Sequence, residues 1–382
     1  MRKIGCVMLV LVLLWSVLPV GAWAVELNVA GKSALLMDAA TGRVLYEKNA
    51  HEKLAPASVT KVMTMLLIME AIDSGKIGWD DTVTASETAA AKGGSQVYLK
   101  AGEMMSVTDM LKSIAVSSAN DCACAMAEHI AGSESAFVEL MNKRAKELGM
   151  EDTHFVNCTG LDDDPNAREH VTSAYDIALM SRQLLVHHPD IKKFTTIWMD
   201  TIRDGSFGLA NTNKLVRFYQ GCTGLKTGFT SGAGYCLSAS ACREGLELIA
   251  VVMGAESSQD RFNACKQMLD YGFANFALVE PALSGDHRVK VTLGTADTVE
   301  AVPVQLPQFL IDKAQRGDVK TEITLEEEVA APVSQGQKLG TLTIKAGDQV
   351  LAQVNMVAKE AVPRLTWWQI FLHVLRRLTM AM

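Results

Sequence analysis

The pattern of apolar and polar positions changes several times along the chain. Residues 33–49 contain two short apolar runs around Ala-Thr-Gly, which predicts a β-hairpin. Over residues 58–190 apolar positions recur mostly at helical spacing, and Gly75 can end the first of these helices. Residues 224–255 form strand-like runs joined by glycine-containing turns, and residues 259–276 are again helical. This order predicts an antiparallel sheet flanked by helices, an α/β (α+β) fold whose first and last elements are neighbours.

From Pro281 onward the pattern changes again. The segments alternate, are rich in valine and threonine, and are separated by glycine and proline. Such segments are typical of short β-strands, so we expect a small all-β domain over residues 281–360. The main domain is then expected over residues 25–280.

Residues 1–24 have the composition of a secretory signal peptide. Arg2 and Lys3 precede an apolar run, and Ala-Trp-Ala at the end resembles a cleavage site. The run is short for a membrane span, although an uncleaved anchor is the alternative. We expect a mature chain that is secreted across the cytoplasmic membrane.

Residues 361–382 predict an amphipathic helix. Two tryptophans and several aliphatic residues share one broad face, whereas Arg376 and Arg377 lie with polar residues on the opposite side. This favours residues 364–382 lying in the membrane surface rather than crossing the bilayer. The alternative is a helix docked on the protein's own core. If the first interpretation holds, this segment attaches the protein to the outer face of the membrane.

Composition narrows the possible functions. The chain has 382 residues, of which 49% are hydrophobic, and a net charge of -7, so disorder and nucleic-acid binding are not expected. Seven cysteines follow residue 24 without a C-x-x-C spacing, which indicates neither a disulfide framework nor a metal site. His170, His187 and His188 fall in predicted loops or helix ends, where surface or capping roles are expected.

Ser58 and Lys61 are the first candidates for chemistry. Residues three apart share a helix face, close enough for a hydrogen bond. A serine hydroxyl becomes a good nucleophile when a base takes its proton, and a lysine can act as that base only when neutral. Burial and the positive end of a helix both lower a lysine pKa. The spacing alone is common, so it needs support from elsewhere in the chain.

Two later segments supply that support. Ser118-Ala119-Asn120 lies between two predicted helices and offers a hydroxyl and an amide in one turn. Lys226-Thr227-Gly228 lies in a predicted strand, where the lysine and threonine could hold a carboxylate and the glycine leaves room for a substrate backbone. The order S-x-x-K, S-x-N, K-T-G is the pattern of class A β-lactamases and penicillin-binding proteins, with Ala119 in place of an aspartate.

The chain resembles the low-molecular-mass penicillin-binding proteins that are D-alanyl-D-alanine carboxypeptidases, with the penicillin-recognising fold. Beyond the three motifs, the resemblance includes LMDAATGRVLYEKNAHEKLAPASVTKVMT, NCTGLDDDPN and TSAYDIALMSRQLL. It extends over about residues 30–280, and the β-rich region and the terminal segment match the family's layout in texture. It implies a substrate, the peptidoglycan stem peptide ending in D-Ala-D-Ala, and covalent binding of β-lactam antibiotics. It implies no metal and no cofactor.

The resemblance also implies a role for each motif residue. Ser58 would attack the carbonyl of the penultimate D-alanine and Lys61 would accept its proton. Ser118 and Asn120 would relay the proton to the leaving D-alanine and hold the substrate amide. The terminal carboxylate would contact Lys226 and Thr227.

The resemblance further implies an oxyanion hole, formed by the backbone N–H groups of Ser58 and of Phe229, the residue after Gly228. Some family members have a histidine where Phe229 stands. Some also use an arginine upstream of the K-T-G strand, and Arg203 does not fall at that place, so it is not included in the site.

Three alternatives remain open. A β-lactamase needs a glutamate-activated water, and the segment NCTGLDDDPNAREH, which contains Glu169, lacks the expected pattern. A transpeptidase of the same fold differs only in whether an amine or water takes the acyl group. A catalytically silent scaffold that binds peptidoglycan belongs to a different class, and the three intact motifs argue against it.

Overall fold

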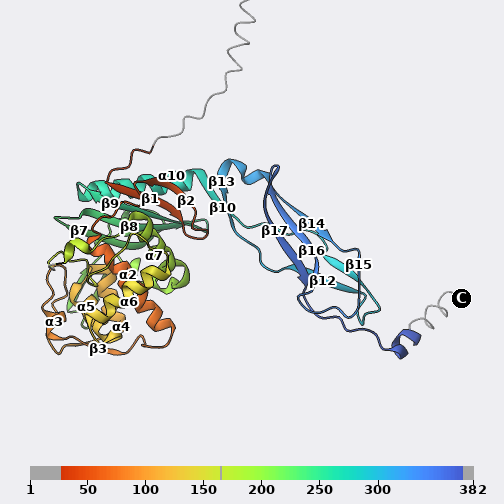
Figure 1. Ribbon diagram of the computed structural model, residues 1–382, viewed down its shortest axis with the longest axis horizontal. Helices are drawn as coiled ribbons and strands as arrows, with labels where there is room; N and C mark the ends of the chain where they lie inside the picture. The colour runs from red at the N-terminus through yellow and green to blue at the C-terminus, as the bar shows by residue number, and fades with distance from the viewer. Residues whose placement is uncertain (1–26, 164–165, 373–382) are drawn as a thin grey trace, which may run out of the picture.

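The computed structural model describes residues 27–163 and 166–372. The predicted signal peptide, residues 1–24, lies outside the described residues. Figure 1 shows a sheet covered by helices, which contains the N-terminal part of the described chain, and an elongated all-β region that follows it. This arrangement confirms the predicted fold class.

A five-stranded antiparallel sheet forms the centre of the first region. The strand order is β2-β1-β9-β8-β7. Because β1 pairs with β2, the predicted hairpin is confirmed. Strand β1 also pairs with β9 and contacts α10 Ser258–Asn275, so the predicted contact between first and last elements is confirmed. The strands are β1 Ser33–Asp38, β2 Val44–Lys48, β7 Cys222–Thr230, β8 Gly234–Arg243 and β9 Leu246–Ala255.

Both faces of this sheet are covered. Every residue of β1 is buried, because alternate side chains of a strand point to opposite faces and each face meets a helical layer. Leu35 and Met37 pack into the core that contains helices α2 Lys61–Asp73 and α7 Ala174–His187. Ala34 and Leu36 pack into a second core, under α10 Ser258–Asn275. A sheet buried on both sides gives a rigid support for residues at its edge strand β7.

The helical block lies between β2 and β7 in sequence. Its longer helices are α2 Lys61–Asp73, α4 Val107–Ser117, α5 Asn120–Ala131, α6 Glu134–Glu147 and α7 Ala174–His187. Helix α2 is buried almost all round, as expected for an apolar helix surrounded by others. The shorter helices are η1 Ala57–Thr60, α3 Glu87–Ala90, η2 Ala167–Glu169, η3 Pro189–Ile191, α8 Lys192–Thr195 and α9 Leu215–Phe218.

Serine residues begin several of these helices. Ser106, Ser133, Ser173 and Ser257 each accept a hydrogen bond from the backbone N–H three residues on. Ser173 is thus the N-cap residue of α7.

Two small two-stranded sheets in this region were not predicted. Strand β3 Thr82–Thr84 pairs with β4 Met104–Ser106, and β5 Met199–Ile202 pairs with β6 Phe207–Ala210. Strands of three or four residues are too short to show a period of two against a helical background.

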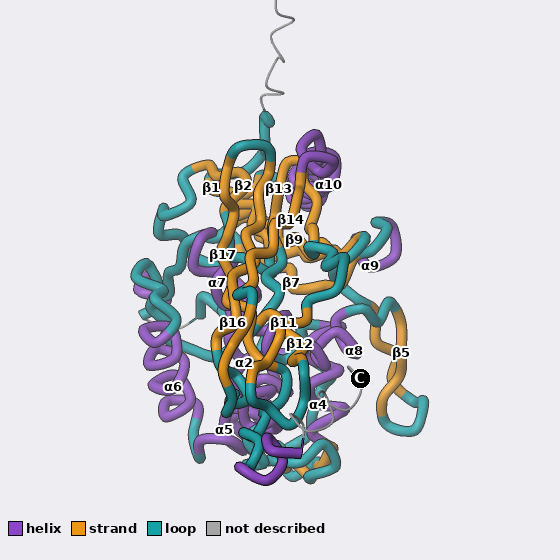
Figure 2. Tube along the Cα trace, turned by 90° about the vertical axis from the view of Figure 1, so that its right-hand side faces the viewer, coloured by secondary structure: helices purple, strands orange, loops and turns teal. Residues whose placement is uncertain are grey.

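The β-rich region contains a six-stranded sheet, in the order β14-β16-β17-β12-β11-β15. Strands β16 and β17 are its longest and lie side by side in antiparallel pairing (Figure 2). Its core is separate from those of the first region and includes Leu339, Leu342, Ile344 and Met356. The elements are β11 Arg288–Thr292, β12 Thr298–Pro303, η4 Lys313–Asp318, β14 Val319–Leu325, β15 Glu328–Ala330, β16 Lys338–Ala346 and β17 Gln349–Ala358.

A short ladder joins the two regions. Strand β10 Phe276–Val279 continues from α10 and pairs with β13 Phe309–Asp312, which belongs to the β-rich part of the chain. Lys313 Nζ donates to the carbonyl of Phe273 at 2.7 Å across the same junction.

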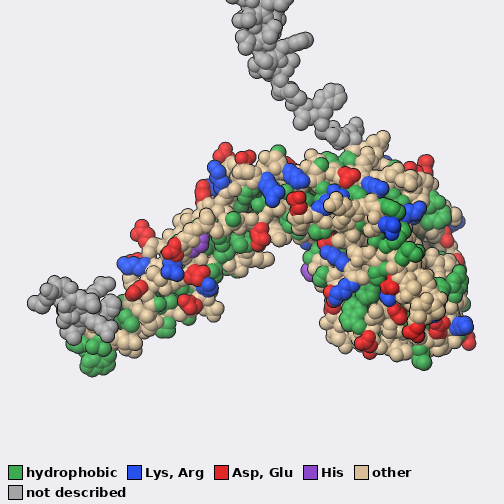
Figure 3. Space-filling model, turned by 180° about the vertical axis from the view of Figure 1, so that it is seen from behind, with side chains coloured by type: hydrophobic (Ala, Val, Ile, Leu, Met, Phe, Trp, Pro, Cys, Tyr) green, Lys and Arg blue, Asp and Glu red, His purple; other side chains and the backbone are tan. Residues whose placement is uncertain are grey.

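The described chain ends in a helical turn, residues 367–372. Trp367, Trp368, Phe371 and Leu372 are exposed there. Figure 3 shows these apolar side chains gathered at the far end of the β-rich region. In the two described segments of the chain, the helices are too short or too polar to span a bilayer.

Candidate active site

Ser58 and Lys61 meet at the junction of η1 and α2. Ser58 lies in η1, and Lys61 is the first residue of α2. Lys61 Nζ lies 2.9 Å from Ser58 Oγ, so the pair makes the hydrogen bond that the spacing predicts. The Lys61 side chain is fully buried, and burial lowers its pKa to about 7, against the opposing effects of Cys158 and Asp121. Near neutral pH a substantial fraction of this amine can therefore accept a proton.

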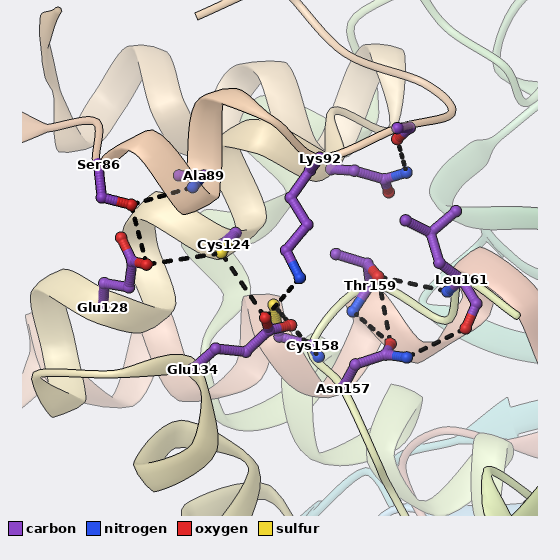
Figure 4. Close-up of polar contacts among 12 residues, drawn as sticks. Ser86, Ala89, Lys92, Cys124, Glu128, Glu134, Asn157, Cys158, Thr159 and Leu161 are labelled. Atoms are coloured by element: carbon purple, nitrogen blue, oxygen red, sulfur yellow. Dashed lines mark hydrogen bonds and ion pairs between the residues drawn. The ribbon is translucent and has the colours of Figure 1, made fainter. Parts of the chain in front are cut away.

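A backbone carbonyl fixes the other side of Lys61. The Lys61 amine donates to the carbonyl of Thr159 at 2.9 Å. The loop that carries this carbonyl is shaped by Asn157 Oδ1, which accepts from the N–H groups of Thr159 and Gly160 and from the Thr159 hydroxyl (Figure 4). At Gly160 an added Cβ would lie 1.8 Å from the carbonyl oxygen of Ala57, so only glycine lets the loop approach η1. Sequence reasoning did not include Thr159 in the site, because a backbone group leaves no trace in residue type.

Ser118 and Asn120 lie on the connection between α4 and α5. Ser118 adopts a left-handed conformation, with φ of 63°, and Asn120 is the first residue of α5. Asn120 Nδ2 donates to the carbonyl of Gly93 at 2.8 Å. Its Oδ1 is buried and, among the described atoms, makes no hydrogen bond. A buried acceptor without a partner is costly, and a substrate amide would satisfy it.

Asp121 is a second residue that sequence reasoning missed. Its buried carboxylate accepts the backbone N–H groups of Val97 at 3.1 Å and Leu99 at 3.0 Å. It thereby holds the segment whose Gly93 and Ser95 carbonyls contact Asn120. Its position next to Asn120 was the one available signal.

Lys226 and Thr227 lie on β7. Lys226 is buried and donates to the carbonyl of Thr227 at 2.9 Å. Burial, followed by the nearby positive charges of Lys61 and Arg261, lowers the pKa of Lys226 well below its ordinary value. Thr227 Oγ1 donates to Thr212 Oγ1 at 2.7 Å.

Gly228 allows β7 to pack against η1. A Cβ at this position would lie 2.7 Å from the carbonyl oxygen of Pro56 and 3.1 Å from the backbone nitrogen of Ser58. The glycine was expected to leave room for a substrate backbone, and the structure adds a requirement within the protein itself. Phe229, the next residue, is exposed and stacks on Tyr235 with ring centroids 4.3 Å apart.

Other residues lie away from this cluster or differ from expectation. His170 is buried, not at the surface, because its Nε2 lies 2.8 Å from Thr60 Oγ1 in the packed layer beside α2. His188 is the C-cap residue of α7 and contacts Asp73. Arg203 contacts Glu103 Oε1 at 2.7 Å and the carbonyl of Val97.

The structure brings the first and third motifs into contact, and Asp121, the residue after the second motif, links that motif to Lys61. Ser58 is adjacent to Lys61 on α2, and Gly228 of β7 lies against the Ser58 backbone. Asp121, which follows Asn120, and Cys158 of the Thr159 loop both influence the charge on Lys61. A serine hydrogen-bonded to a buried lysine of lowered pKa suits acyl transfer through a covalent intermediate.

Comparison with known proteins agrees with this geometry. Residues 21–257 match the D-alanyl-D-alanine carboxypeptidase peptidase family, and residues 276–364 match the family of the C-terminal domain of penicillin-binding protein 5. The chain is 46% identical over 342 residues to the D-alanyl-D-alanine carboxypeptidase DacF of Bacillus subtilis (strain 168), covering 88% of this chain and 86% of that protein.

Solved structures give the same result. Penicillin-binding protein 5 from Haemophilus influenzae aligns with a TM-score of 0.71 and 31% identity, over 88% of this chain and 98% of that one. Penicillin-binding protein D2 from Listeria monocytogenes, in its ampicillin-bound form, aligns with a TM-score of 0.57 and 32% identity, over 65% of this chain and 99% of that one. The chain therefore belongs to the serine-type D-alanyl-D-alanine carboxypeptidases, the low-molecular-mass penicillin-binding proteins.

Proposed function

We propose that this enzyme removes the terminal D-alanine from peptidoglycan stem peptides through an acyl-enzyme on Ser58, with Lys61 as its base. The observation that carries the proposal is the 2.9 Å contact between Lys61 Nζ and Ser58 Oγ in a buried setting. Because the pKa of Lys61 is lowered to about 7, the amine can take the Ser58 proton as the hydroxyl oxygen attacks.

Acylation breaks the bond between the last two D-alanines. Ser58 Oγ bonds to the carbonyl carbon of the penultimate D-alanine, and its proton passes to Lys61. Ser118 then relays a proton to the nitrogen of the leaving D-alanine. The free Oδ1 of Asn120 accepts the N–H of the substrate amide and orients the scissile bond.

Charge that develops on the carbonyl oxygen needs hydrogen-bond donors. We assign this role to the backbone N–H groups of Ser58 and Phe229, which flank the close contact between Gly228 and η1. The substrate carboxylate would lie on Lys226 and Thr227. A bound anion favours the ammonium form of Lys226, which offsets the effect of burial on its charge.

Water then hydrolyses the ester and releases a peptide one residue shorter. A β-lactam would acylate Ser58 in the same way and leave slowly. The enzyme works outside the cytoplasm, where its substrate lies.

Release of free D-alanine from an acyl-Lys-D-Ala-D-Ala tripeptide tests the proposal. We expect release by the wild type and none by Ser58→Ala. A folded wild-type protein that releases D-alanine only when an amine acceptor is added would be a transpeptidase, and one that releases none would be a silent scaffold.

We also propose that residues 361–382 attach the enzyme to the membrane surface, and that residues 281–360 hold the peptidase domain, residues 25–280, away from it. The exposed Trp367, Trp368 and Phe371 support the first part, because tryptophan favours the interface between lipid and water. Full-length enzyme should sediment with vesicles containing anionic lipid. Replacing these three residues with serine should abolish sedimentation, and unchanged sedimentation would contradict the anchor.

A further inference from the structure

The loop that holds Lys61 is itself held from two sides. On its inner side, Thr159 accepts from Lys61 Nζ at 2.9 Å, and the carbonyl of Cys158 accepts from Thr64 Oγ1 at 2.6 Å. On its outer side, the backbone N–H of Cys158 donates to Glu134 Oε1 at 3.2 Å. Glu134 thus binds the residue directly before Thr159, whose carbonyl accepts the hydrogen bond from the catalytic amine.

The Glu134 carboxylate is fully engaged at this position. Besides the Cys158 N–H, it accepts the Cys158 thiol at 3.2 Å, Lys92 Nζ at 2.6 Å and the Cys124 thiol at 3.8 Å (Figure 4). Burial by itself would raise the pKa of Glu134, but the hydrogen bonds from Lys92 and Cys158 bring it below its ordinary value. At neutral pH the group is therefore an anion paired with Lys92.

Helix α6 does not need this carboxylate as a cap. Ser133 is the N-cap residue, and its hydroxyl already accepts from the N–H of Ala136 at 3.2 Å. Glu134 instead points toward the loop of Cys158 and Thr159, and its partner Lys92 comes from the segment after α3 (Figure 4).

We propose that Glu134, paired with Lys92, is a positioning residue for Lys61: it holds the Thr159 carbonyl against the catalytic amine, and the charges of the pair tune that amine. The proposal rests on the proposed function, since it concerns the base that activates Ser58. It makes two separable claims, one about geometry and one about charge.

The charge claim predicts opposite effects from the two partners. Removing Glu134 leaves the positive Lys92 near the loop, which disfavours the ammonium form of Lys61 and lowers its pKa. Removing Lys92 leaves the negative Glu134, which raises the pKa of Lys61. The charges of Cys158 and Asp121 also act on Lys61, and Lys61 in turn acts on Lys226; none of these three residues is changed in the variants.

The experiment follows the rate of Ser58 acylation by a fluorescent penicillin, and D-alanine release, from about pH 5 to about pH 9. Relative to wild type, the acidic limb of the profile should move to lower pH in Glu134→Ala and Glu134→Gln, and to higher pH in Lys92→Met. Glu134→Ala should also lower the acylation rate by up to about a hundredfold, because the amine loses its alignment. Glu134→Gln keeps an acceptor for the Cys158 N–H, so its rate should stay closer to wild type.

Glu139→Ala is the matched control, since Glu139 is an exposed glutamate on the same helix. Its profile should coincide with that of the wild type. Should Glu134→Ala fail to fold, Glu134→Gln and Lys92→Met still test the opposite shifts.

Three results would overturn the inference. The first is an acidic limb of the pH–rate profile that lies at the wild-type pH in both Glu134 variants and in Lys92→Met. The second is a fall in the acylation rate of Glu134→Ala that is fully explained by its smaller fraction of folded protein, measured by thermal melting. The third is a wild type that neither binds penicillin nor releases D-alanine. This result would contradict the proposed function as well, whereas the first two would leave it standing.

Discussion

Lys61 must lose its proton before it can activate Ser58, and its surroundings decide the pH at which this happens. The amine is buried, donates to the Thr159 carbonyl and faces a second buried lysine, Lys226. Desolvation disfavours the charged form more strongly than the charge interactions with Cys158 and Asp121 favour it. The residue therefore combines the position and the protonation state that a base requires.

The pH dependence of turnover should reflect this residue. Because Lys61 acts when neutral and its pKa is about 7, kcat/KM for the tripeptide should rise with pH through about 7 and then level off. Measurement of initial rates across this range in one buffer series tests the prediction. A profile that is flat down to about pH 5 would mean that the base is another group.

The same residue makes the fold sensitive to pH. An unperturbed lysine in the unfolded chain keeps its proton up to about pH 10.4, whereas Lys61 in the folded chain releases it at about 7. Between these two values the unfolded state binds more protons, so this group makes the free energy of unfolding increase with pH.

At the scale of elements, the site depends on how closely β7 approaches η1. An added Cβ at Gly228 would meet backbone atoms of Pro56 and Ser58, which cannot move aside as a flexible side chain could. The close packing of β7 against η1, which the absence of a side chain at Gly228 allows, thus sets the position of the Ser58 N–H.

Gly228→Ala should separate these elements. We expect a loss of about 1–3 kcal/mol in the free energy of unfolding from overpacking. Penicillin acylation should fall by about tenfold or more, because one oxyanion donor shifts. Gly232→Ala is the matched control, since its Cβ would have only one contact, at 3.8 Å. Equal acylation rates in the two variants would contradict this role for the glycine.

Sequence patterns predicted many elements of the fold, because long amphipathic helices and glycine-bounded strands carry a strong signal. The order of the motifs also indicated Ser58, Ser118 and Lys226 as members of one site. Thr159 and Glu134 could not be found in this way. Their roles depend on backbone groups: the Thr159 carbonyl meets Lys61, 98 positions away, and Glu134 meets the Cys158 N–H, 24 positions away. The residue type does not reveal such contacts.

Over the whole molecule, the cores of the first region and the core of the β-rich region are joined by a small junction. The first region contains its own packed layers, and the core of the β-rich sheet is separate. The β10–β13 ladder and the contact between Lys313 and Phe273 join them. Small junctions of this kind usually leave each part to unfold on its own.

Calorimetry should therefore show two unfolding transitions. Penicillin bound to Ser58 should raise the melting temperature of only one of them, because a ligand stabilises the unit that binds it. Replacing Lys313 with methionine should leave both transitions close to their wild-type temperatures. One transition that shifts as a whole would show that the two regions unfold together.

The measurement that tests the central claim most directly is the intact mass of the enzyme after brief exposure to benzylpenicillin, for wild type and Lys61→Met. Methionine fills a similar space without an amine, so the buried core should remain packed. If Lys61 is the base for Ser58, the wild type gains the mass of one penicillin. The folded variant should be acylated at least about a hundredfold more slowly than the wild type. Acylation of Lys61→Met at the wild-type rate would contradict the account.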